Sequence, residues 1–371
     1  MDTRASRFLD LYTTYLLASC GHATATGLSA VVPEVSHDQV TRFLSRRTFG
    51  DKDLWQVVKP MVRRFQSEDA VLILDDTVEE KPYTDASELI CWHFDHTVGR
   101  PVKGVNLLSA LYVSQGVSLP VAFHLIQKTA IAIDPKTGDL ITDAKSGDYK
   151  WQSPVTKNEI ARQRVASVIQ KQIPVRYVLA DSWFSATENL LFIKGKARID
   201  FVIPLKSNRN VFLLDPAAKA GKPTKLDAVD FGGEGICILY LEKLPFPVLV
   251  LRQVFTNEDG SSTHAYLSTS DTTLSASNLR EIYQKRWKIE EFHKSLKSNA
   301  SFAKSPTKKV RTQSNHFFAS IAAFVKLEAC RIAQGGNHFA ISTKIYISAM
   351  KISMSLFQKL VLASPGATIT A

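Results

Sequence analysis

The side chains best suited to chemistry lie in one polar stretch in the last third of the chain, YQKRWKIEEFHKSLK at residues 283–297. The stretch lacks Pro and Gly and is rich in Lys, Glu and Gln, which predicts a helix, and Ser275 or Ser277 can cap its start. At about 100° per residue, one stripe of this helix carries a phenol, a guanidinium, a carboxylate and an ammonium. These four side chains are Tyr283, Arg286, Glu290 and Lys297. A surface helix with ion pairs four residues apart would show the same composition.

Positive charge surrounds this stripe. Between Lys285 and Arg311 the chain has nine Lys or Arg residues, and its only acids there are Glu290 and Glu291. The whole chain of 371 residues has a net charge of +11 and a pI near 9.4, which indicates an anionic partner. A carboxylate that can bind a metal ion, set in a basic field that attracts nucleic acid, suits phosphate chemistry.

The cysteines and the hydropathy of the chain exclude several classes of protein. The four cysteines are isolated and form no CxxC pair, which argues against a disulfide frame or a zinc knuckle and fits a reducing cytosol. We find no signal peptide and no apolar run long enough to span a membrane. We therefore expect a cytoplasmic protein with no membrane partner.

The spacing of the four polar residues, Tyr-x2-Arg-x3-Glu-x6-Lys, resembles the Tyr-Arg-Glu-Lys signature of bacterial DDE transposases of the "insertion sequence four" family. The resemblance implies that Glu290 is the third metal-binding carboxylate and that Tyr283, Arg286 and Lys297 hold DNA phosphates. It also implies two upstream aspartates, each at the end of a buried strand.

The first candidate aspartate follows the apolar run AVLIL at residues 70–74, which predicts a short buried strand. The run ends in Asp75-Asp76-Thr77. Two carboxylates at the tip of a buried strand are costly unless a cation neutralises them, and a divalent metal is a natural partner. A helix cap or turn is the alternative. The family pattern of Asp, any residue, then Ser or Thr favours Asp75, whereas alignment on Asp-Thr favours Asp76.

The second candidate aspartate, Asp181, ends the apolar run VRYVLAD and is followed by small and aromatic residues, as in the family. A further strand at residues 201–205 leads into a basic run that includes Lys206 and Arg209. This run is either a solvated turn or a phosphate-binding segment. To these predicted DNA contacts we add two residues of the polar helix and two of the amino-terminal segment, namely Trp287, Lys294, Arg42 and Arg46.

The order of strands, carboxylates and helices resembles the α/β, ribonuclease-H-like (retroviral-integrase-like) fold of such transposases. The runs at residues 105–113 and 119–126 predict an antiparallel meander with the first strand. His93, Asp95 and His96 could bind zinc, contact DNA or serve the structure. We predict a helical DNA-binding segment at 1–66, the first part of the core at 67–210, a β-rich insertion at 211–272, the catalytic helix at 273–310 and a helical segment at 311–371.

The resemblance implies a DNA transposase in which Asp75 or Asp76, Asp181 and Glu290 bind two Mg²⁺ ions, with Mn²⁺ as an alternative. Such an enzyme cuts at transposon ends and joins the 3′-OH to target DNA. Its partners would be double-stranded DNA, as terminal inverted repeats and target, and a second copy of itself in the DNA complex, in a bacterial cytoplasm near the nucleoid. A metal nuclease without strand transfer and a non-catalytic DNA-binding derivative are the alternatives.

Overall fold

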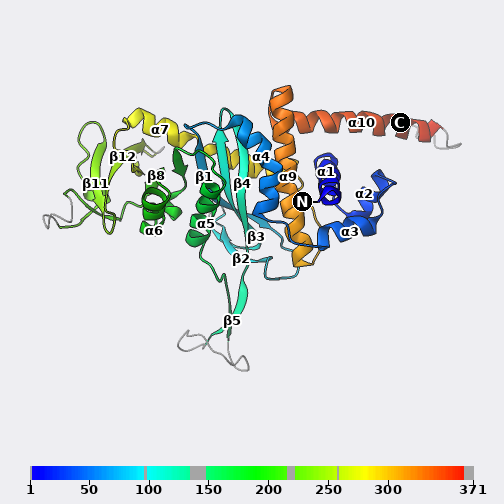
Figure 1. Ribbon diagram of the computed structural model, residues 1–371, viewed down its shortest axis with the longest axis horizontal. Helices are drawn as coiled ribbons and strands as arrows, with labels where there is room; N and C mark the ends of the chain where they lie inside the picture. The colour runs from blue at the N-terminus through cyan, green and yellow to red at the C-terminus, as the bar shows by residue number, and fades with distance from the viewer. Residues whose placement is uncertain (1, 96–97, 134–147, 215–221, 257–258, 363–371) are drawn as a thin grey trace. The chain divides into compact units, whose positions relative to one another are not determined.

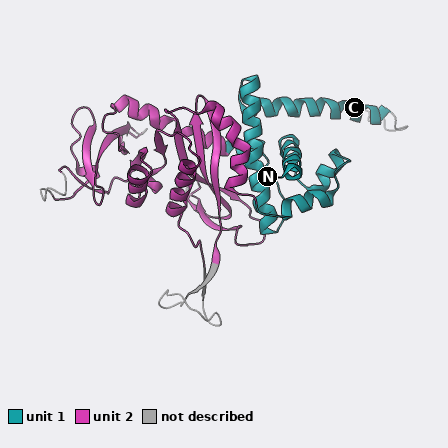
Figure 2. Ribbon diagram, in the orientation of Figure 1, with its two compact units in different colours: residues 1–48, 294–371 teal, residues 49–293 magenta. Residues whose placement is uncertain are grey.

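The computed structural model describes residues 2–95, 98–133, 148–214, 222–256 and 259–362. The chain forms two compact units, one of residues 49–293 and one that combines residues 1–48 with 294–371 (Figure 2). We describe each unit by itself. The functional boundaries predicted at residues 66, 210, 272 and 310 stay predictions, because compact packing alone does not assign a function to a segment.

The core of the unit 49–293 is a mixed sheet, as an α/β fold requires. Its first strands are β1 (Val71–Glu80), β2 (Cys91–Asp95), β3 (Arg100–Ser114), β4 (Val117–Ile126), β7 (Tyr177–Leu179) and β8 (Asp200–Leu205). The predicted meander is confirmed, because β3 pairs antiparallel with both β1 and β4. β7 runs parallel to β1, and β8 runs parallel to β7. The antiparallel and parallel halves therefore meet at β1.

The strands of the predicted β-rich insertion continue the same sheet. They are β9 (Asn210–Phe212), β10 (Thr224–Lys225), β11 (Ile236–Leu241), β12 (Pro247–Thr256) and β13 (Ser262–Thr269). Because β13 pairs antiparallel with β8, the order becomes β10-β9-β11-β12-β13-β8-β7-β1-β3-β2, with β4 beside β3 (Figure 1). The insertion thus covers an edge of the core that would otherwise leave backbone groups unpaired.

The first strand is longer than its apolar run predicts. Residues 71–74 are buried, and the next five residues of β1 are half-buried. The strand continues to Glu80 because β3 pairs with its whole length, with Asp75 opposite Ser109 and Asp76 opposite Leu108. The prediction that the strand ends at the two aspartates is therefore wrong, because β1 continues beside β3 past both of them. The pairing of β1 with its parallel neighbour β7 does end before the aspartates, at Ile73.

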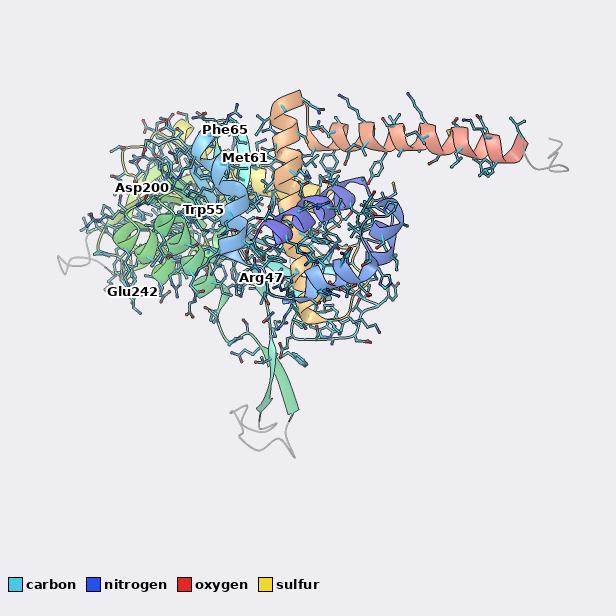
Figure 3. All side chains as sticks on the ribbon, turned by 45° about the vertical axis from the view of Figure 1, so that its right-hand side comes forward. Arg47, Trp55, Met61, Phe65, Asp200 and Glu242 are labelled. Carbon is cyan, nitrogen blue, oxygen red and sulfur yellow. The ribbon has the colours of Figure 1, made fainter. Side chains whose placement is uncertain are left out.

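Several helices surround this sheet. They are α4 (Asp51–Phe65), α5 (Lys157–Gln170), α6 (Thr187–Leu191) and α7 (Ala276–Gln284), with one-turn helices at Ser182–Phe184 and Leu226–Ala228 and a π-helix at Phe192–Lys196. Trp55, Met61 and Phe65 follow one another along α4 (Figure 3). The Asp51 carboxylate accepts a hydrogen bond from the Phe123 N–H at 2.9 Å and pairs with Arg164, which ties α4 to β4 and α5. A separate pair of strands, β5 (Thr129–Ile133) and β6 (Asp148–Gln152), forms a small second sheet.

The predicted helix over residues 283–297 is interrupted. α7 ends at Gln284 and α8 runs over Trp287–Asn299. Between them the Arg286 N–H bonds to the Tyr283 carbonyl oxygen and the Ile289 N–H to the Arg286 carbonyl oxygen, at 2.9 and 3.1 Å. These bonds span three residues rather than four, so the backbone is too tightly wound to continue as one α-helix. The predicted cap is confirmed for Ser275, whose Oγ accepts from the Asn278 N–H at 3.2 Å.

The other unit is helical. It contains α1 (Thr3–Ala18), α2 (Ala25–Val31), α3 (His37–Ser45), α9 (Val310–Gln334) and α10 (His338–Leu362). Buried polar contacts connect them: the Tyr12 hydroxyl lies 3.0 Å from His316 Nδ1, and Asn315 Nδ2 donates to the Leu44 carbonyl oxygen at 2.8 Å. Ser36 and Gln39 form a capping box at the start of α3.

Helix α10 is anchored at its start and apolar beyond it. His338 lies 2.8 Å from Ser295 Oγ through Nδ1 and 2.8 Å from Glu328 through Nε2, and Arg331 also pairs with Glu328. By length and mean hydropathy α10 could span a membrane, so the expectation of no such run was wrong. One helix of this kind is weak evidence for a membrane protein.

Candidate metal centre

The two aspartates of β1 are in different surroundings. Because side chains alternate along a strand, Asp75 and Asp76 point to opposite faces of the sheet. The Asp76 carboxylate accepts hydrogen bonds from Lys157 Nζ and Asn106 Nδ2, both at 2.7 Å. Asp76 therefore already has a cationic partner within hydrogen-bond distance.

Asp75 has no comparably close cation among the described contacts. Arg286 Nη1 lies 3.8 Å from its Oδ2, and the backbone N–H of Asp76 donates to its Oδ1 at 2.9 Å. The pKa of Asp75 is raised to about 8, chiefly by burial and then by the negative charges of Asp181, Asp76 and Glu290, while Arg286 opposes the rise. The surroundings of Asp75 thus contain more negative charge than Arg286 neutralises, as expected of a site that takes up a metal cation.

The parallel ladder brings Asp181 to the level of Asp75. Ile73 pairs with Leu179, and each aspartate follows two residues later: Asp75 on β1, and Asp181 in the turn just after β7. Asp181 Oδ1 accepts from the Trp183 N–H at 3.0 Å, which fixes the turn after β7. Burial raises the pKa of Asp181, the Trp183 N–H lowers it, and the charge of Asp76 raises it again. Two carboxylates from segments about a hundred residues apart therefore lie side by side where the parallel pairing of β1 and β7 ends.

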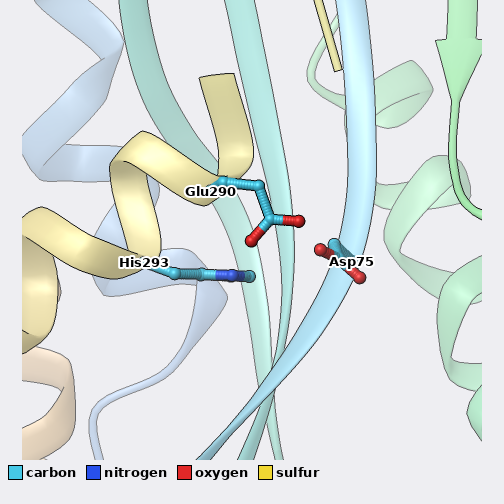
Figure 4. Close-up of side chains that lie close together, drawn as sticks. All are labelled: Asp75, Glu290 and His293. Carbon is cyan, nitrogen blue, oxygen red and sulfur yellow. The ribbon is translucent and has the colours of Figure 1, made fainter. Parts of the chain in front are cut away.

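Helix α8 brings two further groups to this edge. Figure 4 shows the carboxylates of Glu290 and Asp75 facing one another, with the ring of His293 beside them. Within the described part of the chain, these three residues form one group whose metal-binding atoms all lie within 4.8 Å of one another. Sequence reasoning missed His293, although its position three residues after Glu290 places both on one face of a helix.

The donor set fits a divalent metal. Carboxylate oxygens are the ligands that Mg²⁺ prefers, and an imidazole nitrogen suits transition metals. Ligand atoms on one ion at about 2.1 Å lie at most about 4.2 Å apart, so a small rotation of these side chains would close the group. Asp181 is not within the 4.8 Å group, but its charge acts on Asp75. The site can therefore hold a cation through Asp75 and Glu290, with Asp181 at its border.

Three predicted DNA-binding residues lie where the two helices meet. Arg286 is mostly buried; its Nη1 lies 3.4 Å from Glu290, and its guanidinium lies 5.9 Å from the centre of the Tyr283 ring. The pKa of Tyr283 is raised to about 12, chiefly by burial; Arg286 opposes the rise, and the charges of Asp181 and Asp75 add to it. Trp287 is 64% exposed. The structure thus places Tyr283 and Arg286 beside the carboxylates and leaves the Trp287 ring accessible.

The basic run after β8 divides into two environments. Lys206 is exposed, and its Nζ lies 5.9 Å from the centre of the Trp183 ring. Arg209 is half-buried, and its guanidinium donates to the Ser185 carbonyl oxygen at 2.6 Å and to Thr187 Oγ1 at 2.9 Å. Burial lowers the pKa of Arg209. Arg209 therefore supports the segment that follows Asp181, while Lys206 is the one directed to solvent.

The remaining predicted DNA contacts belong to the helical unit. Arg42 and Arg46 are exposed at α3, and Lys294 Nζ lies 5.3 Å from the centre of the Phe339 ring. Lys297 is half-buried. The roles of these four residues in DNA binding stay predictions.

The predicted zinc alternative at residues 93–96 gains no support. His93 is buried and lies 3.3 Å from Cys91 Sγ through Nε2. The pKa of His93 is lowered to about 4, chiefly by burial and then by the positive charges of Lys128 and Lys157. His96 lies outside the described residues. Within the described residues, His93 belongs to no group of three or more metal-binding side chains.

Comparison with known proteins adds one finding to this geometry. A protein-family model described as "DDE superfamily endonuclease" matches residues 1–231, which is more than half of the chain. A search of curated proteins returned no match. The matched region includes Asp75, Asp76 and Asp181 and ends before α8, so the position of Glu290 rests on the structure.

Proposed function

The chain belongs to the DDE superfamily endonuclease family, and from that membership we propose that it is a DNA transposase, which cuts at transposon ends and transfers the 3′-OH to target DNA. Nuclease-type chemistry follows from the family. Strand transfer, the "insertion sequence four" assignment and a bacterial cytoplasmic location are our proposals, based on the Tyr-Arg-Glu-Lys spacing of α7 and α8.

The observation that carries the proposal is the meeting of acidic groups from distant segments at one edge of the sheet. Asp75 on β1 faces Glu290 on α8, and Asp181 follows β7 at the level of Asp75. Carboxylates at the carboxyl ends of neighbouring parallel strands form a suitable place for ligands. The strand order β4-β3-β1-β7-β8, antiparallel and then parallel, supports a ribonuclease-H-like core.

In this proposal Asp75, Asp181 and Glu290 hold divalent Mg²⁺, for which Mn²⁺ can substitute. Bound ions of this kind activate the attacking water or 3′-OH and stabilise the leaving oxygen. The protein's own part is mainly positioning. Asp76, paired with Lys157 and Asn106, serves the structure rather than the first metal position. We therefore choose Asp75 as the first catalytic acid.

Cations around the site would hold the DNA backbone. Arg286 lies between Asp75 and Glu290, where a guanidinium can bind a phosphate oxygen as the strand enters. Tyr283, Trp287, Lys206, Lys294 and Lys297 are proposed as further contacts, as are Arg42 and Arg46 in the helical unit. The partners are terminal inverted repeats and target DNA, bound by a homodimer.

The test compares two neighbouring carboxylates of α8. Glu290→Gln removes the charge that faces Asp75, whereas Glu291→Gln removes an exposed charge that pairs with Lys288 at 2.8 Å. Each variant is incubated with Mg²⁺, with duplexes that carry the element's terminal inverted repeats and with a second target duplex. We expect Glu290→Gln to lose strand cleavage by a factor of about 10³ or more and Glu291→Gln to retain it.

The products separate the proposal from its alternatives. A transposase yields a 3′-OH end that becomes joined to the target duplex. Cleavage without joining would favour a metal nuclease of the same family, and DNA binding without cleavage by the wild-type chain would favour a non-catalytic derivative. Full cleavage by Glu290→Gln would reject the role assigned to Glu290.

A further inference from the structure

A histidine stands inside the acidic site. His293 lies one turn after Glu290 on α8, and its side chain is directed toward the same space as the Asp75 carboxylate (Figure 4). A ring nitrogen of His293 is within 4.8 Å of oxygens of both acids. Neither the family match, which ends at residue 231, nor the Tyr-Arg-Glu-Lys spacing includes this residue.

The packing of α8 holds the imidazole in place. His293 is only 5% exposed, and the neighbouring Ile289 and Phe292 are fully buried on the core side of the helix. The Phe292 ring lies 5.4 Å from the His293 ring, centre to centre. A side chain fixed in this way loses little conformational entropy when it binds an ion, which favours its use as a ligand.

The chemistry of the three groups differs from that of an all-oxygen magnesium site. Mg²⁺ takes carboxylate and water oxygens, whereas imidazole nitrogen is a good ligand for first-row transition metals. Two carboxylates and one imidazole form a mixed set that stabilises such a metal more than it stabilises Mg²⁺. On the other side of Asp75, Asp181 can supply only carboxylate oxygens as metal ligands.

We propose that His293 is a nitrogen ligand of the cation held by Asp75 and Glu290, so that this position prefers Mn²⁺ or Co²⁺ to Mg²⁺. The proposal rests on the metal-dependent function proposed above and specifies the cofactor class of one position. It makes the metal positions on the two sides of Asp75 chemically unequal: one of mixed nitrogen and oxygen ligands, the other of oxygen ligands alone.

The experiment measures binding, not turnover, on the full-length chain. Mn²⁺ and Co²⁺ are titrated into the metal-free protein, with bound Mn²⁺ followed by electron paramagnetic resonance and Co²⁺ by its visible absorption. Pulsed resonance on the Mn²⁺ form detects a directly bound nitrogen. The variants are His293→Asn, a smaller uncharged polar side chain without a ring nitrogen, and His293→Asp, which supplies a carboxylate oxygen. His264→Asn, at an exposed histidine of β13, is the matched control.

We expect the wild type and His264→Asn to show nitrogen coupling and His293→Asn to lack it. Mn²⁺ and Co²⁺ affinity should fall by about tenfold or more in His293→Asn, with Mg²⁺ affinity changed far less. His293→Asp should keep Mg²⁺ binding and lose the preference for Co²⁺. If Mn²⁺ bound to the wild-type protein shows no nitrogen coupling, the proposal is overturned, whether or not the variants fold. Equal losses of affinity for Mn²⁺, Co²⁺ and Mg²⁺ in His293→Asn would also overturn it.

The same titrations distinguish this inference from the proposed function. If the folded wild type binds none of the cations, or binds them equally well in Glu290→Gln, the metal-dependent function itself fails. If binding depends on Glu290 while His293→Asn leaves both affinity and coupling unchanged, the function stands and only the nitrogen ligand is rejected.

Discussion

Replacing Asp75 by Asn is expected to stabilise the metal-free protein at alkaline pH, although it should abolish activity. The pKa of Asp75 is about 8 in the folded chain against an ordinary 3.8. Between these values the folded protein keeps a proton that the unfolded chain has released. Raising the pH across this range therefore favours the unfolded state, by up to about 1.4 kcal/mol per pH unit.

The magnitude follows from the same values. The full difference in pKa corresponds to an upper bound of about 6 kcal/mol near pH 8, which solvent penetration and local relaxation reduce. We expect Asp75→Asn to raise the free energy of unfolding by about 2–3 kcal/mol near pH 8. Near pH 5 the folded wild-type carboxyl is already protonated, so the gain should shrink to about a third of that value.

The assay is urea unfolding with EDTA at both pH values. Asp76→Asn is the matched control, because its carboxylate is paired with Lys157 and Asn106 and its removal should destabilise the protein. Excess Mn²⁺ should stabilise the wild type and leave Asp75→Asn unaffected. The reasoning about this buried charge would be refuted if Asp75→Asn has no larger free energy of unfolding than the wild type near pH 8. It would also be refuted if the substitution stabilises the protein equally at both pH values.

Three further predictions concern the support of the site. Metal uptake should release up to about one proton per chain near pH 7 and almost none near pH 9, because Asp75 must ionise to bind a cation. Calorimetry in buffers of different ionisation enthalpy measures the number of protons released. Equal proton release at the two pH values would contradict the prediction. Arg209→Ala removes the hydrogen bonds to Ser185 and Thr187 and should lower the cleavage rate by about tenfold or more, with little change in DNA affinity. Single-turnover cleavage measures the rate, and filter binding measures the affinity. A loss of affinity without a change in rate would mean that Arg209 contacts DNA instead. Gly104→Ala should destabilise by about 2 kcal/mol or more, since the added carbon would collide with the Glu79 carbonyl oxygen, whereas Gly195→Ala meets open space and serves as the control in thermal unfolding.

Much of the core could be predicted from the sequence because its signals are local. The short apolar runs before Asp75 and Asp181 favour buried strands, and the composition of residues 283–297 favours a helix. What brings the acids together is the parallel register of β1 and β7, which depends on residues far apart in the chain. The family resemblance, not periodicity, supplied that expectation.

The misses have physical reasons. The break between α7 and α8 lacks Pro and Gly, and propensity alone predicts a continuous helix. β1 extends through Glu80 because the long strand β3 pairs with it, which no local pattern reveals. His293 was overlooked because a lone histidine on a helix has many ordinary structural uses; its proximity to Asp75 becomes visible only in three dimensions.

The two strands that carry the aspartates differ greatly in length. β1 has ten residues, every one of them paired with β3, whereas β7 has three. Asp75 therefore lies on a long strand that is hydrogen-bonded along its whole length. Asp181 follows a short strand, and the turn after it is held by the hydrogen bond from Arg209 to the Ser185 carbonyl oxygen. If the chain acts as the transposase proposed above, we expect the Asp181 side of the site to adjust to successive DNA strands while Asp75 keeps its position.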